Sequence, residues 1–248
     1  MFKWLSKYFA SPAELREAGI LGMNSRNFKF IAKQNKRRLY PLVDDKVQTK
    51  ALALQYGINT PRLIGTIDYQ HEVDRLPLLV KDWPSFVIKP AHGSGGKGVL
   101  VIKSHDGETF VTPSGRSLTY KEIYQHISNT LSGLYSLGGQ YDTAVIEEMV
   151  NFSHIFDSYS YQGIPDVRII VYKGYPVMAM TRLATAASGG RANLHQGAVG
   201  VGLDIKTGKT LKAVMRNMPI THHPDTNADL SKIEVPFWRE HLLIGAKA

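Results

Sequence analysis

Cysteine is entirely missing from the 248 residues of this sequence. Its absence excludes a disulfide scaffold, a thiolate zinc site and a cysteine nucleophile, and it fits a reducing compartment. The sequence also has no run of about 18 apolar residues, which a membrane-spanning helix requires. Charged residues interrupt the opening segment MFKWLSKYFASPAELREAGILGMN, so it lacks the continuous apolar stretch of a secretory signal. We therefore expect a cytoplasmic protein with no membrane span.

The first ten residues leave one alternative open. They mix five large apolar or aromatic residues with Lys3 and Lys7, which is also the composition of an amphipathic helix lying on a membrane surface. An ordinary packed helix has the same pattern, and we favour it.

Negative charge is scarce, because 21 Asp and Glu residues face 30 Lys and Arg residues and the formal net charge is +9. Such a balance suits an anionic partner, whether a nucleotide, a nucleic acid or an acidic peptide. The densest basic run, KQNKRRLY at residues 33–40, contains a single aromatic residue and matches no nucleic-acid-binding module. We interpret it as a solvated helix face and expect no nucleic-acid partner.

The apolar residues, 43% of the chain, are enough for a substantial core and follow both helical and strand patterns. Helical spacing predicts helices over 12–34, from residue 44 or 45 to residue 56, and over 119–136. Strands are expected at 86–89, 99–103 and in YDTAVIEEMV, and hairpins are expected to turn at Lys173–Gly174 and Thr207–Gly208. Tight turns between neighbouring strands predict antiparallel pairing, and hence an α+β fold.

A glycine-rich loop stands between two of the expected strands, in FVIKPAHGSGGKGVLVI. Its backbone N–H groups can converge on phosphate oxygens, while Lys89 and Lys97 supply positive charge. It is neither a Walker A loop nor a Rossmann fingerprint, because no helix follows it. A phosphate-covering flap and a plain mobile hairpin fit this composition about equally well.

The segment AVIEEMV is an apolar strand that ends in two carboxylates and continues into Met149 and Val150. An adenine ring needs an apolar slot, an acceptor for its amino group and a backbone N–H, and this segment can offer all three. Taken alone, the segment is better explained as a strand end with one solvated carboxylate.

Polar residues also gather in the segment from Asp166 to Asp204, at the expected ends of strands and in loops. Arg168 and Arg182 stand among apolar neighbours and must find anionic partners, because an unpaired buried guanidinium is very costly. For Arg168, a structural pair with Asp166 and a binding role are equally consistent. His195 alone is more typical of a structural histidine than of a catalytic one.

These segments, in this order, resemble the ATP-grasp ligases, and most closely the α-L-glutamate ligase-like branch related to the enzymes that add glutamate to a ribosomal protein. The likeness covers nearly the whole chain, from MNSRNFKFIAKQNKRRLYPLVDDKVQTKALALQYGINTP through FVIKPAHGSGGKGV and IEEMV to DVRIIV, MTRLA, GGRANLHQG and GVGLDIKTG. It implies two α+β subdomains whose antiparallel sheets grip ATP. We expect a helical region over 1–75, the small subdomain over 76–150 and the large subdomain over 151–248.

The resemblance also implies roles for individual residues. Lys46 and Lys89 would contact the ATP phosphates, and Asp157 or His154 would reach the ribose. The flap over the phosphates would be formed by His92 to Gly98, including Ser94, Gly95, Gly96, Lys97 and Gly98, and the adenine site by Glu147, Glu148, Met149 and Val150. Arg182, Arg191 and Asn193 would be catalytic, because they match the positions that hold the acyl phosphate and the acceptor.

By the same resemblance, ATP phosphorylates a carboxylate, and the amine of an amino acid such as glutamate attacks the acyl phosphate. The substrates would be a carboxylate acceptor and an amino acid, and the cofactors ATP and Mg²⁺. Charge accumulates on the transferred phosphate, so lysines, arginines, amides and Mg²⁺ suffice for catalysis without a nucleophilic side chain.

The sequence departs from the family at its end. The family continues with a Glu-x-Asn motif that holds two Mg²⁺ ions, whereas this chain stops at VPFWREHLLIGAKA, so its metal ligands are unknown. We expect an incomplete large subdomain, weak ATP binding, little turnover and exposed sheet surface that allows homo-oligomers to form.

Two alternatives remain open at this point. Related ATP-grasp sequences that serve sugar transfer share HPDT, here His223 to Thr226, and GVGLDIKTG. A catalytically impaired nucleotide-binding protein would keep the flap and the adenine site without the metal site.

Overall fold

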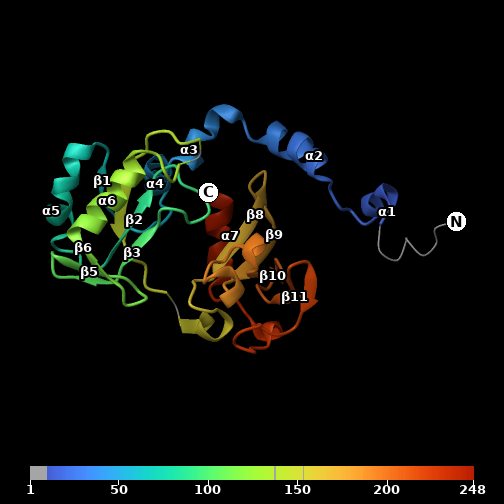
Figure 1. The fold of residues 1–248 in the computed structure, drawn as a ribbon. Helices are drawn as coiled ribbons and strands as arrows, with labels where there is room; N and C mark the ends of the chain where they lie inside the picture. The colour runs from blue at the N-terminus through green and yellow to red at the C-terminus, as the bar shows by residue number, and fades with distance from the viewer. Residues whose placement is uncertain (1–9, 137, 153) are drawn as a thin grey trace. The chain divides into compact units, whose positions relative to one another are not determined.

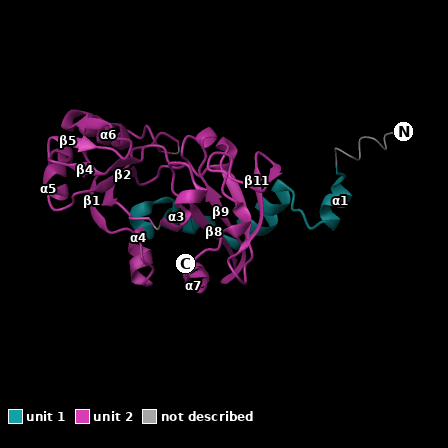
Figure 2. Ribbon diagram, turned by 90° about the horizontal axis from the view of Figure 1, so that it is seen from below, with its two compact units in different colours: residues 1–49 teal, residues 50–248 magenta. Residues whose placement is uncertain are grey.

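The computed structural model describes residues 10–136, 138–152 and 154–248, and Figure 1 shows the order of their elements. The expected amphipathic helix of the first ten residues therefore lies almost wholly outside the described residues. The chain divides into two compact units, residues 1–49 and residues 50–248 (Figure 2). Among the described residues, no helix is both long and apolar enough to cross a membrane.

The described part of the first unit, residues 10–49, contains only short helical segments and the beginning of α4 (Lys46–Gln55). They are α1 (Pro12–Glu17), α2 (Met23–Ser25), a π-helical stretch over Arg26–Ala32, a 3₁₀ turn over Arg37–Leu39 and α3 (Pro41–Asp44). The prediction of one helix over 12–34 is wrong, because Gly19 has a φ of +73° and ends α1 after a single capped segment. Ser11 caps this helix, since Ser11 and Glu14 form a capping box.

The helix α4 (Lys46–Gln55) follows and ends before Gly57, whose φ is +63°. The predicted helix from residue 44 or 45 to residue 56 is thus confirmed within the usual uncertainty of helix ends. Lys50, on this helix, is buried although it is a lysine. A buried ammonium group requires an anionic partner, which the sheet described next provides.

Four antiparallel strands form the first sheet, in the order β1 (Leu63–Ile67), β7 (Ala144–Glu148), β2 (Phe86–Pro90) and β3 (Leu100–Ile102). Alternate residues point to opposite faces of each strand. Phe86, Ile88 and Ile146 belong to one core, together with residues of helix α6 (Tyr120–Leu131). The opposite face carries Lys89 and Glu147, so the alternation that builds the core also presents two charged side chains together.

A small three-stranded sheet precedes α6 and was not expected from the sequence. Its strands are β4 (Ser104–His105), β5 (Thr109–Val111) and β6 (Ser117–Thr119), paired antiparallel in that order. Helix α5 (Leu76–Val80) and the preceding 3₁₀ segment Gln70–Arg75 complete this part of the chain. The boundaries expected after residues 75 and 150 stay predictions, although β1 already belongs to the same sheet as β2.

Five antiparallel strands form the second sheet, in the order β12, β11, β10, β9, β8. Their bounds are β8 (Asp166–Tyr172), β9 (Tyr175–Leu183), β10 (Val199–Leu203), β11 (Thr210–Met215) and β12 (Met218–Ile220). The hairpin predicted at Lys173–Gly174 is confirmed, and both residues have positive φ, as a tight two-residue turn requires. The hairpin predicted at Thr207–Gly208 is confirmed as well.

One face of the second sheet is covered. Leu183, Val199 and Val201 pack against the 3₁₀ turn Leu230–Lys232 and Ile233, and helix α7 (Trp238–Lys247) contacts β8 and β9. Further 3₁₀ turns lie at His154–Tyr159, Ala186–Ser188 and Leu194–Gln196. The opposite face of the sheet carries the two arginines considered in the sequence, Arg168 and Arg182.

Candidate functional site

The charged cluster on the first sheet consists of one carboxylate and two ammonium groups. Glu147 forms ion pairs with Lys89, through Oε1, and with Lys50, whose Nζ lies 2.7 Å from Oε2. Lys50 Nζ also donates a hydrogen bond to the carbonyl of Pro61. Glu147 and Lys50 are only 5% and 6% exposed, so these groups must satisfy one another.

This cluster differs in two ways from the expected roles. Glu147 was expected beside adenine, but its carboxylate is shared between two lysines, so its adenine role stays a proposal. Lys50 was not among the predicted site residues, although its place four residues after Lys46, on one helical face, was a usable indication. Lys89 lies on the face of the sheet opposite the core, and its side chain is 19% exposed.

The glycine loop connects β2 and β3. Glycine is required at its positions for two different reasons. At its two ends, Gly93 and Gly98 leave no room for a Cβ atom, which would lie 2.2 Å from Pro90 and 2.5 Å from the Tyr135 ring respectively. At its tip, Gly95 and Gly96 have φ values of +65° and +74° and open space around them. The loop is therefore packed at its ends and open at its tip, where Ser94 and Lys97 are exposed.

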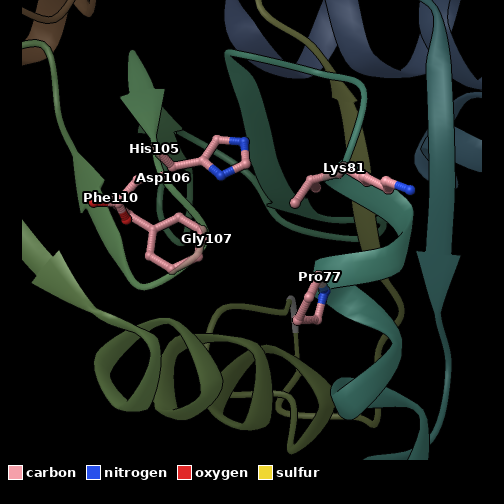
Figure 3. Close-up of a pocket in the computed structure, with 7 residues that line it drawn as sticks. Pro77, Lys81, His105, Asp106, Gly107 and Phe110 are labelled. Carbon is pink, nitrogen blue, oxygen red and sulfur yellow. The ribbon is translucent and has the colours of Figure 1, made fainter.

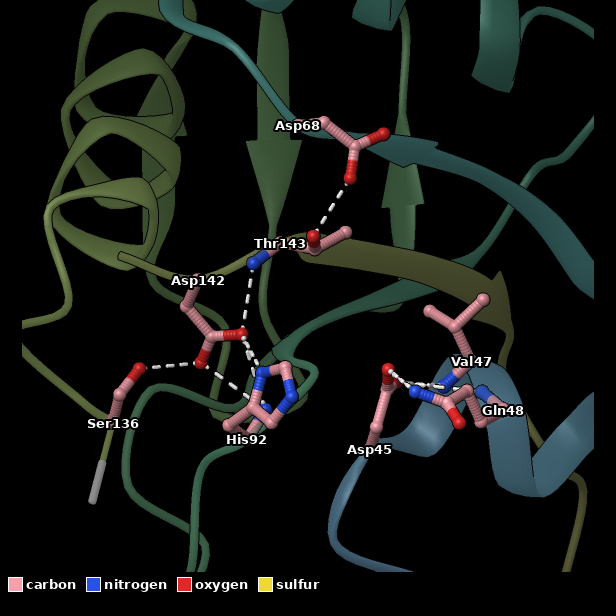
Figure 4. A network of polar contacts seen from close by, with 8 residues as sticks. All are labelled: Asp45, Val47, Gln48, Asp68, His92, Ser136, Asp142 and Thr143. Atoms are coloured by element: carbon pink, nitrogen blue, oxygen red, sulfur yellow. Dashed lines mark hydrogen bonds and ion pairs between the residues drawn. The ribbon is translucent and has the colours of Figure 1, made fainter. Parts of the chain in front are cut away.

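Asp142 holds the start of this loop (Figure 4). Its carboxylate accepts hydrogen bonds from the backbone N–H groups of His92, at 3.1 Å, and Thr143, at 2.8 Å. The His92 ring and the Ser136 hydroxyl bind the same carboxylate. Burial raises the pKa of Asp142, but the hydrogen bonds from Ser136 and His92 outweigh it and hold the pKa below its usual value.

The end of β7 continues into the predicted adenine segment. Glu148 is fixed against the preceding chain, since its Oε1 accepts from Arg62 N at 2.8 Å and its own N–H donates to Arg62 O at 3.0 Å. Met149 is half-buried and Val150 is 40% exposed. An open apolar edge next to a charged cluster is the composition that the adenine proposal needs.

Asp157, predicted to reach the ribose, lies in the 3₁₀ turn His154–Tyr159. Its carboxylate is 2.7 Å from Nδ1 of His154, and both side chains are mostly exposed. The structure therefore pairs the two residues that the sequence proposed as alternatives, and neither is held by buried neighbours.

On the second sheet, Asp166 binds both arginines. It lies opposite Arg182 in the register of β8 and β9, and accepts from Arg182 Nε at 2.7 Å and from Arg182 Nη2. Arg168 Nε lies 3.3 Å from the same carboxylate. The structural pair considered for Arg168 is thus present, but one carboxylate serves two guanidinium groups, so this patch keeps a net positive charge.

The open face of this sheet also contains a shallow cavity of about 350 Å³. Two glycines of β10, Gly200 and Gly202, lie opposite Arg182 and Met180 and leave the space that side chains would otherwise fill. Its lining combines apolar and cationic side chains: Arg168, Ile170, Met178, Met180, Leu194, Lys212 and Val214. An apolar floor with cations at its border suits a ligand with a flat ring and an anionic group.

The loop between β9 and β10, residues 184–198, carries the remaining predicted catalytic residues. Arg191 is exposed, whereas Asn193 is half-buried and its Nδ2 donates to Gln196 Oε1 at 3.3 Å. The ends of the loop are joined, because Thr185 Oγ1 donates to Gly197 O at 2.8 Å. We name this segment the β9–β10 loop.

A metal site and Lys46 remain to be placed. In the described parts of the chain, no group of three or more Asp, Glu or His residues could hold a metal ion. Lys46 begins α4 within the first unit, and its phosphate contact stays a prediction.

A further cavity of about 250 Å³ is lined by Pro77, Lys81, His105 and Phe110, among others (Figure 3). His105 stacks on Phe110, and its Nε2 is 2.8 Å from Trp83 O. These contacts give the ring a structural role in packing. The cavity contains none of the residues predicted from the sequence.

Three comparisons with known proteins were made, and two of them found a match. The chain matches a solved structure of phosphoribosylamine–glycine ligase from Thermotoga maritima, with 20% identity and a TM-score of 0.39 over 65% of this chain. This match spans about a third of that protein's length, 34%. No curated protein matches the sequence. The family description that matches residues 25–248 is sugar-transfer associated ATP-grasp, and the chain therefore belongs to the sugar-transfer associated ATP-grasp family, with the ATP-grasp fold.

Proposed function

We propose that this protein binds ATP at the face of the first sheet that carries Lys89 and uses it to join a carboxylate to an amine. The observation that carries the proposal is the placement of Lys89 on that face, beside a glycine loop with an open tip and an apolar strand end. In this arrangement Lys89 and the loop amides bind phosphate oxygens, and the segment from Glu147 to Val150 borders the adenine.

The reaction we propose has two steps. An oxygen of the substrate carboxylate attacks the γ-phosphorus of ATP, the bond to the ADP oxygen breaks, and an acyl phosphate forms. The amine nitrogen then attacks the acyl carbon, inorganic phosphate leaves, and the nitrogen loses its proton. The transferred phosphate carries the greatest negative charge in both steps. Arg182, Arg191 and Asn193 would bind it there. Mg²⁺, bound with ATP, would neutralise further charge.

Calorimetry of ATP binding in the presence of Mg²⁺ tests the first part. We expect Lys89→Ala to weaken ATP binding about tenfold or more, because one charge-assisted contact to phosphate is lost. Lys121→Ala is the matched control, since Lys121 is exposed on α6, the helix that packs on the other face of the sheet. Equal affinities of the two variants, or no ATP binding by the unmodified chain, would contradict the proposal.

The substrate has two candidate classes. The resemblance in sequence favours an amino acid such as glutamate, whereas the matched family is described as sugar-transfer associated, which favours a carboxylate or amine carried on a saccharide. ADP release should be followed with free glutamate and, separately, with amino-sugar and sugar-acid substrates. ADP release that requires the saccharide, and is absent with glutamate and simple carboxylates, would support the second class.

A further inference from the structure

The segment HPDT, residues 223–226, has no part in the proposed chemistry, yet it contains a fully buried histidine. His223 is 1% exposed, and its Nε2 lies 3.0 Å from the carbonyl oxygen of Ala184, the first residue of the β9–β10 loop. Its Nδ1 lies 3.3 Å from the N–H groups of both Asp225 and Thr226. Two amide donors on Nδ1 fix the neutral tautomer that carries its proton on Nε2, so Nε2 donates to Ala184.

Each of the other three residues fits the same turn. Pro224 has no N–H group, so no donor is left unpaired between His223 and the two amides that bind its ring. The Asp225 carboxylate accepts from the N–H of Ala186 at 2.9 Å, two residues into the β9–β10 loop. The turn is closed by Asn227 N–H, which donates to His223 O at 2.9 Å, and by Ala228 N–H, 3.4 Å from Thr226 Oγ1.

The β9–β10 loop is therefore fixed at both ends. Residues of the HPDT turn bind its beginning, and a hydrogen bond within the loop joins its beginning to its end. His223 and Asp225 bind Ala184 and Ala186, and Thr185, which lies between them, is buried and bonded to Gly197. Thr185 and Ser188 also exchange hydrogen bonds, and the chain then turns through Gly189 and Gly190, both with positive φ, directly into Arg191. The course of the backbone into Arg191 therefore depends on where Ala184 to Ala186 are fixed.

We propose that the HPDT turn positions the β9–β10 loop, so that Arg191 and Asn193 meet the phosphate that is transferred from ATP. His223 and Asp225 act as positioning residues, through the backbone of Ala184 and Ala186, and touch no substrate. This inference rests on the proposed function, because that function assigns the transferred phosphate to the loop.

The experiment compares Asp225→Ala with Asp225→Asn, since asparagine keeps an oxygen that accepts from Ala186 N–H. Asp225 is exposed, so both variants should fold. Two quantities are measured. One is the ratio of affinities for ATP and ADP in the presence of Mg²⁺, by calorimetry. The other is the rate of tryptic cleavage after Arg191, with cleavage after the exposed Arg116 as an internal reference.

We expect Asp225→Ala to weaken ATP binding about tenfold, to leave ADP binding within about twofold, and to speed cleavage after Arg191 several-fold. Asp225→Asn should match the unmodified protein in both the ratio of ATP to ADP affinity and the rate of cleavage after Arg191. His223→Gln, which keeps a donor for Ala184 O but removes the acceptor for two amides, should behave like Asp225→Ala if it folds.

Unchanged cleavage after Arg191 would overturn the inference, and so would faster cleavage with an unchanged ratio of ATP to ADP affinity. Equal weakening of both nucleotides would also overturn it, because that result indicates a general loss of structure. If the unmodified chain binds neither nucleotide, the proposed function fails and the phosphate part of the inference fails with it. Cleavage after Arg191 then decides whether the turn anchors the loop.

Discussion

Glu147 lies between Lys50 and Lys89 where little water reaches any of the three side chains. A carboxylate removed from water is tolerated only because two ammonium groups bind it. The buried ammonium group of Lys50 is likewise tolerated because this carboxylate binds it. Removing the carboxylate would leave two positive charges close together, and one of them would still be buried.

We therefore expect Glu147→Gln to lower the free energy of unfolding by about 3 kcal/mol, as for the removal of one partner from a buried ion pair. Urea denaturation at neutral pH measures this change. The matched control is Glu148→Gln, which keeps an oxygen for Arg62 N–H at the neighbouring, half-buried position and should cost about 1 kcal/mol or less. Equal losses in the two variants would show that the ion pairs contribute little.

Asp142 gives stability a dependence on pH. Its pKa in the folded protein lies below its usual value, so the unfolded chain binds a proton at a higher pH than the folded one does. The stabilisation by Asp142 is therefore complete above the unfolded pKa, about 3.9, and is lost as the pH falls through and below that value.

Asp142→Asn should accordingly lower the free energy of unfolding by about 2 kcal/mol at pH 7, because it replaces charge-assisted hydrogen bonds to His92 and Thr143. The difference from the unmodified protein should shrink as the pH approaches 3.5. Urea unfolding midpoints between pH 3.5 and 7 test this, and a difference that stays constant over that range would contradict it.

The glycine loop shows how an element can combine a fixed base with an open tip. Gly98 packs against the ring of Tyr135, and His126 Nε2 lies 3.0 Å from the carbonyl oxygen of Gly98. A Cβ atom added at Gly95 would meet no described atom within 4 Å beyond its chain neighbours, so the positive φ is what favours glycine there. The two positions should respond differently to the same added methyl group.

Gly98→Ala should destabilise the protein by about 2–4 kcal/mol, since it combines a steric clash with the strain of a positive φ. Gly95→Ala should cost about 1–2 kcal/mol, from the strain alone. Urea denaturation measures both, and Tyr135→Ala as a second change should remove much of the penalty at Gly98. An equal cost at the two glycines would show that the loop base adjusts freely.

Helices, strands and turns that are determined by residues close together in the sequence could be predicted. The turn at Lys173–Gly174 and the α4 stop at Gly57 follow from glycine at positions of positive φ, and β2, β7 and α6 follow from the spacing of their apolar residues. The strands β4, β5 and β6 could not be predicted, because elements of two or three residues have no measurable period.

The candidate site divides in the same way. Lys89 and the glycines could be singled out as candidates because strand and loop composition point to them directly, and their role stays a prediction. Lys50 was missed because its importance lies in a contact with Glu147, and only the folded sheet brings these two distant residues together. The anchoring role of His223 likewise depends on a tertiary contact, so the motif alone showed that the segment matters but not why.

At the scale of the whole molecule, the two units differ in their cores. All three clusters of buried apolar residues lie within residues 67–238, and none of residues 10–49 is buried. A segment without buried side chains opens at low cost in free energy, and its basic run at 33–38 offers several sites for trypsin.

The first cuts by dilute trypsin should therefore fall within residues 33–38, and the larger product should remain folded. Mass spectrometry of the early products identifies the cuts, and circular dichroism of the larger product measures its fold. Cutting that starts within residues 67–238 instead would contradict this view of where the stability resides.

The order of the first sheet has a consequence for how the chain acquires its structure. The strand β7 lies between β1 and β2, although both of these strands precede it in the sequence. β1 cannot bond to its sheet neighbour until residues 144–148 have been synthesised, whereas β2 can already pair with β3 on its other side. The growing chain must therefore leave β1, and the edge of β2 that faces β7, without a strand partner while about 75 further residues are made. We infer that this sheet forms late and slowly, because its closing contacts join distant parts of the chain.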